Sequence, residues 1–390
     1  MTAELATAPA DAGAATATGV GPGAAKKLRR CAKDRIILGA LAAALAVTAV
    51  VAAGSGQLFI APAEVLGSIV HGFNNWLQGW LDYFGGGLTA PFGWAPLPEH
   101  ARGYETLWSV RFPRVVLAMV VGAALACAGT VMQGVFGNPL AEPAVVGVSS
   151  GAAVGASTAI VTGLATHGNW LVALFAFLGG LITTLLVYSL SRRKGRTEVV
   201  TLVLTGIAVN AFTFAMIAFY TYVADPNARE QLIFWQLGSL NGAGWVSVVS
   251  VLPLLVAGLA MAFAAAEKLD LLALGERSAR HLGVNVERLR MTMIVTVALL
   301  VGAGVAFTGI VSFVGLVVPH LIRIIAGPGH RLLLPASALG GALLVLLADL
   351  GARTLVAYSD LPLGMLTALI GGPFFFWLLR RTRNEQGGWA

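Results

Sequence analysis

Long apolar runs separated by short polar segments follow one another along most of the chain. An α-helix of about 20 apolar residues can cross the hydrocarbon core of a bilayer, so each run predicts one membrane crossing. The shortest run, 314–325, and the glycines inside several others predict that some crossings are broken or incomplete helices. The ten expected crossings are residues 36–53, 115–136, 144–164, 170–190, 199–223, 245–265, 291–313, 314–325, 332–350 and 363–379.

The longest charged interruption between these runs is residues 267–290, with the sequence EKLDLLALGERSARHLGVNVERLR. Its apolar residues recur at helical spacing in two short stretches, and a glycine follows each stretch. A glycine just past a helix end can adopt the positive φ that stops the helix. The pattern predicts two short helices joined by a turn, which either lie on the lipid surface or bind a partner. The residues concerned are Leu271, Leu274, Ala279 and Leu282, with Gly275 and Gly283 as the helix-ending glycines.

Residues 54–110 form the largest segment between crossings and combine several aromatic residues with scattered acids. Amphipathic aromatic side chains favour the headgroup layer of a membrane. The segment is therefore expected as an outer insertion, part of which lies along the membrane as one or two short helices. The aromatic residues concerned are Trp76, Trp80, Tyr83, Trp94 and Trp108.

Composition agrees with the apolar runs, because 57% of the residues are hydrophobic and only 11% are charged. These values indicate an all-α polytopic membrane protein rather than a soluble domain. The 48 glycines suit helices that pack closely through small residues. The net charge of +7 does not indicate nucleic-acid binding, because the basic residues are spread between the crossings. Cys31 and Cys127 are too few for a disulfide framework.

The distribution of basic residues predicts the orientation, since lysine and arginine favour cytoplasmic loops. With the N-terminus inside, 20 of the 25 basic residues are cytoplasmic, so both termini and residues 267–290 are expected on that side. We expect a disordered basic tail over 1–35, a transmembrane domain over 36–382 and a second cytoplasmic tail over 383–390. Residues 26–53 also resemble a signal peptide, but their apolar run is longer than a usual signal core, which favours a retained helix.

Two glycine-rich stretches resemble each other, GAALACAGTVMQGVFGNPLAEP at 122–143 and GAGVAFTGIVSFVGLVVPHLIR at 302–323. Each runs from small residues to a break that contains proline, and the predicted orientation makes them cross in opposite directions. Inverted repeats place a transport pathway between two similar halves in many transporters. The echo favours a transporter, although glycine-rich crossings also resemble each other by chance.

The sequence contains no phosphate-binding loop, no zinc-protease motif and no histidines or cysteines at metal-ligand spacing. An enzyme is therefore not expected. His320 after Pro319 is interpreted as a packing residue, and Asp349, inside an apolar run, as a partner of Arg353 or of water. An ion-coupled secondary transporter is the alternative of another class, and it would need polar groups near the middle of the membrane.

Five stretches form an ordered set of motifs: RFPRVVLAMVVGAALACAGTVMQGVFGNPLAEPAVVGVSSGAAVGA at 111–156, FWQLGSLNGAGW at 234–245, the segment 267–290, SFVGLVVPHLIRIIAGPGHRLLLPASALGGALLVLLADLGARTL at 312–355, and LPLGMLTALIGGPFFFWLL at 361–379. Over about residues 105–382 the chain resembles the FecCD-type permease subunits of bacterial ABC importers for iron siderophores, haem and cobalamin. The resemblance implies a type II ABC importer permease fold in the bacterial cytoplasmic membrane. It favours haem as the cargo, with a ferric siderophore or cobalamin as alternatives.

The resemblance also implies partners. Residues 267–290 would be coupling helices that bind a cytoplasmic ATPase, which would hold ATP and Mg, so this chain would bind no cofactor. An external or periplasmic substrate-binding protein would bind outer arginines, for which anchoring in lipid headgroups is the alternative. A second permease copy, most simply in a homodimer, would complete the pathway. The implied residues are Leu271, Leu274, Gly275, Glu276, Arg277, Ala279, Leu282 and Gly283 for coupling, Arg111, Arg114 and Arg353 for docking, and Asn138, Pro139 and Asn210 for the pathway.

Overall fold

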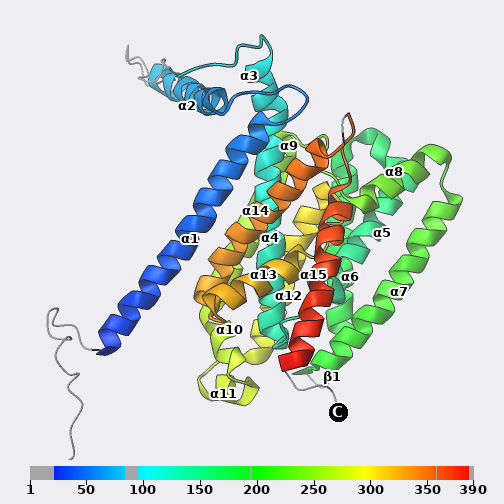
Figure 1. Ribbon diagram of the computed structural model, residues 1–390. Coiled ribbons are helices and arrows are strands. Elements are labelled where there is room, and N and C mark those ends of the chain that lie inside the picture. Colours follow the sequence, from blue (N-terminus) through cyan, green and yellow to red (C-terminus); the bar gives the residue numbers. More distant parts are fainter. Residues whose placement is uncertain (1–21, 84–94, 194–195, 357, 386–390) are drawn as a thin grey trace, which may run out of the picture.

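The computed structural model describes residues 22–83, 95–193, 196–356 and 358–385. Within these residues, seven helices are long and apolar enough to cross a membrane, and three shorter apolar helices accompany them. They coincide with the ten predicted crossings and confirm the all-α membrane fold (Figure 1). Their bounds are α1 (Pro22–Gly54), α4 (Phe112–Phe136), α5 (Val148–Val161), α6 (Asn169–Leu190), α7 (Val199–Val223), α9 (Trp245–Ala264), α12 (Val286–Thr308), α13 (Val314–Ala326), α14 (His330–Thr354) and α15 (Leu363–Glu385).

The shorter elements gather mainly at the two ends of the bundle, which we call the α2 end and the α11 end (Figure 1). At the α2 end lie α2 (Pro62–Tyr83), α3 (Gly103–Thr106), the π-helical η1 (Leu107–Arg111), η3 (Leu164–His167) and α8 (Pro226–Leu237). At the α11 end lie α10 (Ala266–Ala273), α11 (Glu276–His281) and the strands β1 (Arg192–Arg193) and β2 (Arg196–Thr197). The first residues of α1 and the last residues of α15 both lie at the α11 end.

Residues 22–35 belong to α1, so the prediction of a disordered tail over 1–35 was wrong for this part. The stretch is rich in alanine, lysine and arginine, which are strong helix formers, and it starts at Pro22, where proline is tolerated in a helix. The spanning helix therefore continues beyond its apolar run. At the other terminus α15 extends to Glu385, and residues 1–21 and 386–390 lie outside the described residues.

Helix α4 is the centre of the bundle, and most of its residues are buried against α14, α12, α13 and α9. Two glycines of α4 meet glycines of neighbouring helices. A Cβ atom added to Gly122 would lie 2.3 Å from the carbonyl oxygen of Gly341, and one added to Gly129 would lie 1.8 Å from that of Gly315. Only glycine allows backbones to approach this closely, which is how helices associate where no water drives their packing.

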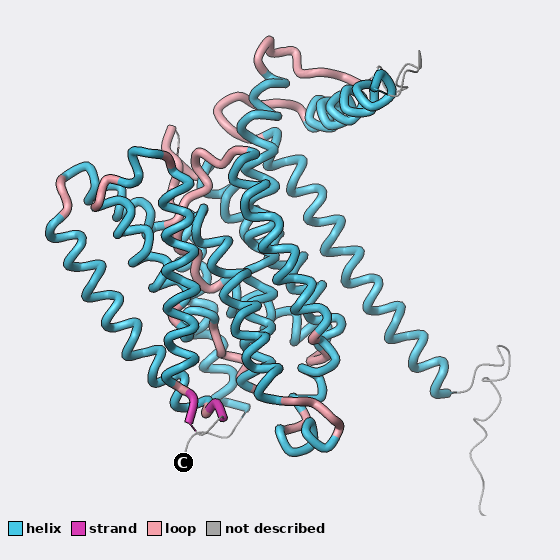
Figure 2. Tube along the Cα trace, turned by 180° about the vertical axis from the view of Figure 1, so that it is seen from behind, coloured by secondary structure: helices cyan, strands magenta, loops and turns pink. Residues whose placement is uncertain are grey.

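Two units of the fold share one plan, in which a long helix, an extended break and a half-length helix follow one another (Figures 1 and 2). In the first unit, α4 leads through residues 137–142 and the 3-10 turn η2 (Pro143–Val146) into α5. In the second unit, α12 leads through residues 309–313 into α13. Helices α4 and α12 run in opposite directions. The structure thus places a break in each copy of the inverted echo, but the second break does not contain the predicted proline, because Pro319 lies inside α13.

Gly129→Ala should destabilise the protein by about 1–3 kcal/mol, because the added methyl group meets backbone atoms that cannot rotate away. The check is the thermal unfolding midpoint of the detergent-purified protein. Gly39→Ala in α1 is the matched control, since a Cβ there meets nothing within 4 Å. An unfolding midpoint for Gly129→Ala equal to that of the control would contradict the close contact between α4 and α13.

Candidate functional site

Helices α10 and α11 form a projecting pair at the α11 end (Figure 1). Gly275 and Gly283 follow the two helices with φ of +101° and +84°, as the glycine pattern predicted. Leu274 and Leu282 are 66% and 59% exposed and present an apolar surface to the surroundings. Ala279 is fully buried, so it packs inside the pair and is not available for the contact with a partner that the sequence predicted for it.

Ion pairs and hydrogen bonds hold this helix pair on the bundle. The buried Arg290 of α12 pairs with Glu276 and donates to the carbonyl oxygen of Thr197 at 3.1 Å. Asp270 Oδ1 accepts a hydrogen bond from the backbone N–H of His330 at 2.7 Å and lies 2.7 Å from Nδ1 of the same residue. Glu276 therefore positions the pair. The other predicted coupling residues are the half-buried Leu271 and the exposed Arg277.

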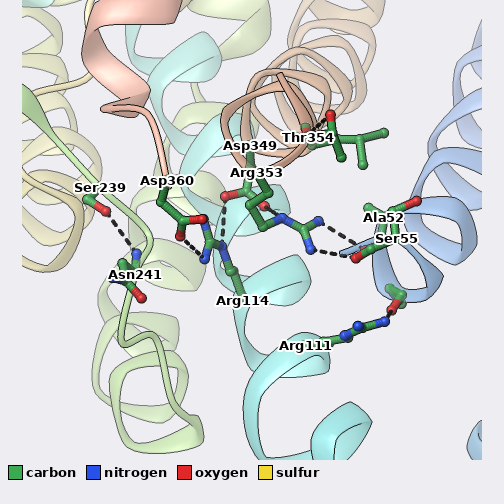
Figure 3. Close-up of polar contacts among 12 residues, drawn as sticks. Ala52, Ser55, Arg111, Arg114, Ser239, Asn241, Asp349, Arg353, Thr354 and Asp360 are labelled. Atoms are coloured by element: carbon green, nitrogen blue, oxygen red, sulfur yellow. Dashed lines mark hydrogen bonds and ion pairs between the residues drawn. The ribbon is translucent and has the colours of Figure 1, made fainter. Parts of the chain in front are cut away.

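Three arginines near the α2 end converge on Asp349 and on the last turn of α1 (Figure 3). Arg114 of α4 lies 2.9 Å from Asp349 and 2.8 Å from Asp360. Arg353, one turn after Asp349 in α14, lies 3.1 Å from it, so the predicted pair of these two residues is confirmed. Asp349 is only 1% exposed, and the two guanidinium groups compensate its buried charge.

The arginines also cap the end of α1. Arg353 donates to the carbonyl oxygens of Ala52 and Ser55 at 3.0 and 3.1 Å. Arg111, which is 7% exposed, donates to the carbonyl oxygen of Gly54 at 3.0 Å. The last carbonyls of a helix lack partners within it and carry the negative end of its dipole, so cations suit them. All three predicted docking arginines thus have partners inside the chain, and their contact with an external protein stays a prediction.

Asn210 of α7 binds the break that follows α4. Its Oδ1 accepts a hydrogen bond from Ser150 Oγ at 2.6 Å, and its Nδ2 donates to the carbonyl oxygen of Ala144 at 3.3 Å. Asn138 and Pro139 are exposed in the turn after α4. Of the three predicted pathway residues, the structure therefore places Asn210 alone at the junction of α5, α7 and η2.

Helix α7 stands at the edge of the bundle (Figure 1). Only 17% of the residues in its most apolar stretch are buried. An open groove of about 680 Å³ lies between α7 and α8. An apolar helix face beside an open groove is typical of an interaction surface. The groove is lined by Phe214, Ile217, Ala218, Thr221, Tyr222, Arg229, Ile233 and Gln236.

Glu142, which no sequence pattern singled out, joins the two breaks of the fold. Its Oε1 accepts a hydrogen bond from the backbone N–H of Phe313 at 3.2 Å, immediately before α13. A small cavity of about 50 Å³ lies beside this contact, and its lining includes Pro143 from the first break and Ser312 from the second. Glu142 looked like a loop residue between crossings, but an acid inside a proline-containing break of a repeated stretch is a signal that could have identified it.

The FecCD transport family matches residues 44–381 of the chain. The chain belongs to this family. The FecCD chain is 44% identical to a hemin transport system permease of Yersinia pestis, over 72% of its own length and 85% of that protein. It is 42% identical to a cobalamin import permease of Halobacterium salinarum, over 73% and 75% of the two lengths.

A solved structure supports the same fold. A metal-chelate type ABC transporter in an inward-facing conformation superposes on the FecCD chain with a TM-score of 0.74 at 30% identity. The superposition covers 88% of this chain and 99% of the other. These relatives confirm the predicted type II importer permease fold and a role in transport rather than in catalysis.

Asp349→Asn should destabilise the FecCD chain by about 3–5 kcal/mol, because it leaves Arg114 and Arg353 without their shared buried carboxylate. The half-exposed Asp360 offers the matched control, and Asp360→Asn should cost about 1 kcal/mol or less. Both values follow from denaturant unfolding of the purified protein. Equal losses for the two variants would show that burial does not set the strength of the cluster.

Proposed function

We propose that this FecCD chain is the membrane-spanning permease of an ATP-driven importer that carries haem across the bacterial cytoplasmic membrane. The 44% identity to a hemin permease, which extends over most of both chains, carries the proposal. The inverted pair of broken helices supports it, because this plan suits a pathway that opens alternately to the two sides. The chain contributes the passage, and its partner contributes ATP hydrolysis with Mg.

The ATPase partner binds the exposed leucine surface of α10 and α11 in this proposal. Leu274 and Leu282 supply apolar area, and the ion pair of Glu276 with Arg290 holds that area in a fixed position. A fixed apolar anchor binds with a smaller loss of conformational entropy than a mobile one. Both described chain ends lie on this side together with the basic segments, which supports cytoplasmic termini.

A second permease copy and an external binding protein complete the proposed assembly. The exposed face of α7 and the groove beside α8 suit an interface between two copies, with the cargo pathway along it. A two-fold arrangement would bring the same surface of each copy together. The binding protein would deliver cargo at the α2 end, opposite the ATPase.

Cobalamin is the second candidate cargo, because cobalamin permeases are 42% and 39% identical to this chain over similar lengths. Haem and cobalamin are both large ring systems with apolar and polar parts. The described residues of the groove are mainly apolar and include Arg229 and Gln236 at its polar side. This lining does not favour one of the two ligands over the other, so selection would rest with the binding protein.

The substrate proposal is tested by ATP-driven uptake into proteoliposomes that contain the permease, its ATPase and its binding protein. Haem, cobalamin and a ferric siderophore are compared at equal concentration, and haem should accumulate only when ATP is present on the ATPase side. Accumulation of cobalamin or a siderophore without haem would show that haem is not the cargo, and it would leave the assignment as an ATP-driven importer standing. Uptake driven by an ion gradient without ATP would support a secondary transporter instead.

Leu282→Glu should lower ATP-driven uptake about tenfold or more, because a buried contact at the ATPase would then contain an unpaired charge. Leu282 is 59% exposed, so the unfolding midpoint of the permease should not change. Leu97→Glu, at a leucine that is 47% exposed at the α2 end, is the matched control, and the ATPase should co-purify with it normally. Full uptake and normal co-purification of the ATPase with Leu282→Glu would refute the proposed docking surface.

A further inference from the structure

Helix α2 carries a continuous apolar arc that the described chain leaves exposed. Its large apolar residues recur every three or four positions, which places them on one side of the helix. Their exposed fractions range from 44% to 84%. We call this side the aromatic arc, and it consists of Leu66, Ile69, Phe73, Trp76, Trp80 and Tyr83.

The opposite side of α2 is held by the rest of the chain. His71 Nε2 lies 2.8 Å from the carbonyl oxygen of Ala95, and Glu64 accepts a hydrogen bond from the backbone N–H of Glu99 at 3.4 Å. A Cβ added to Gly67 would lie 1.7 Å from the carbonyl oxygen of Pro96. Residues 95–102 thus fix the polar side of α2, and the aromatic arc is turned away from them.

The position of α2 places the aromatic arc where a membrane surface would be. α2 begins eight residues after α1 ends, and it lies across the outer end of α1, to the side of the bundle (Figure 1). In both views residues 95–102 run on the side of α2 that faces away from the bundle (Figures 1 and 2). The arc therefore faces the level at which α1 leaves the hydrocarbon core. Only 11% of the residues in the most apolar stretch of α1 are buried, so most of this span is free to face lipid.

We propose that α2 is an interfacial helix that binds the lipid headgroup layer through the aromatic arc. Tryptophan and tyrosine favour this layer because their rings have an apolar body and a polar group. Helix α2 carries Glu64 and Asp82 but no lysine or arginine, so its attachment rests on apolar area and does not require anionic lipid. Because residues 95–102 and Trp108 pack on α2, the lipid contact also fixes the height of the start of α4 relative to the membrane.

The test measures which side of α2 meets lipid. Single cysteines replace Phe73 and Trp80 on the aromatic arc, and Asn75 and Asp82 on the polar side serve as matched controls, since all four residues are exposed. Cys31 is replaced by alanine, and the fully buried Cys127 is kept. Each cysteine is spin-labelled, and the permease is placed alone in uncharged phosphatidylcholine vesicles. Collision rates with oxygen, which concentrates in lipid, and with a water-soluble nickel chelate are then compared.

Labels at Phe73→Cys and Trp80→Cys should show an oxygen-to-nickel collision ratio several-fold higher than labels at Asn75→Cys and Asp82→Cys. Equal, water-like ratios on both sides would overturn the proposal. Labels on the aromatic arc that neither reagent reaches would also overturn it, because such shielding indicates contact with protein, in this system a second copy. A high ratio that appears only after anionic lipid is added would contradict attachment by apolar area.

Discussion

A backbone inside a membrane must find its hydrogen-bond partners within the protein, and this constraint decides where the chain can interrupt a helix. The first break starts at the exposed residues Asn138 and Pro139 and turns inward at Ala141 and Glu142, where it meets the second break. Gly129 and Gly315 bring the backbones of α4 and α13 together, and Glu142 from the first break accepts the N–H of Phe313 in the second. The contact of this partly buried N–H contributes about 0.5–1.5 kcal/mol, the range for an ordinary hydrogen bond. The two inverted units therefore depend on each other at their breaks.

The same constraint explains the ionic cluster at the α2 end. Helix α1 is mostly exposed and packs on the bundle mainly along α14, and its last carbonyls need donors as the chain leaves the helix. Arg111 and Arg353 supply these donors, and Asp349 balances the charge of Arg353 and Arg114. Three helices are thereby joined at one end by groups that would be costly to bury singly. The cluster therefore fixes the end of α1, a helix that buries few of its residues against the bundle.

The sequence predicted the seven long and three shorter apolar helices because the length of an apolar run is a local property. It also predicted the two helices at 267–290, since each ends at a glycine with positive φ. It did not predict that Ala279 is buried or that Arg111 faces α1, because both depend on which helices become neighbours. Glu142 was missed for the same reason, since its partner Phe313 is 171 residues away. Residues whose roles come from long-range pairing are those that a pattern cannot locate.

The attachment of α10 and α11 suggests how an event at the α11 end can reach the membrane interior. Glu276 binds Arg290 on α12, which leads into the second break, and Asp270 binds His330, where α14 begins after α13. The helix pair is thus bonded to α12, which precedes the second break, and to α14, which follows α13. Helices transmit displacement as rigid bodies, whereas an extended break can change its dihedral angles. A partner that moves α10 and α11 would therefore act on residues 309–313, the segment that rests on Glu142 at the junction of the two inverted units.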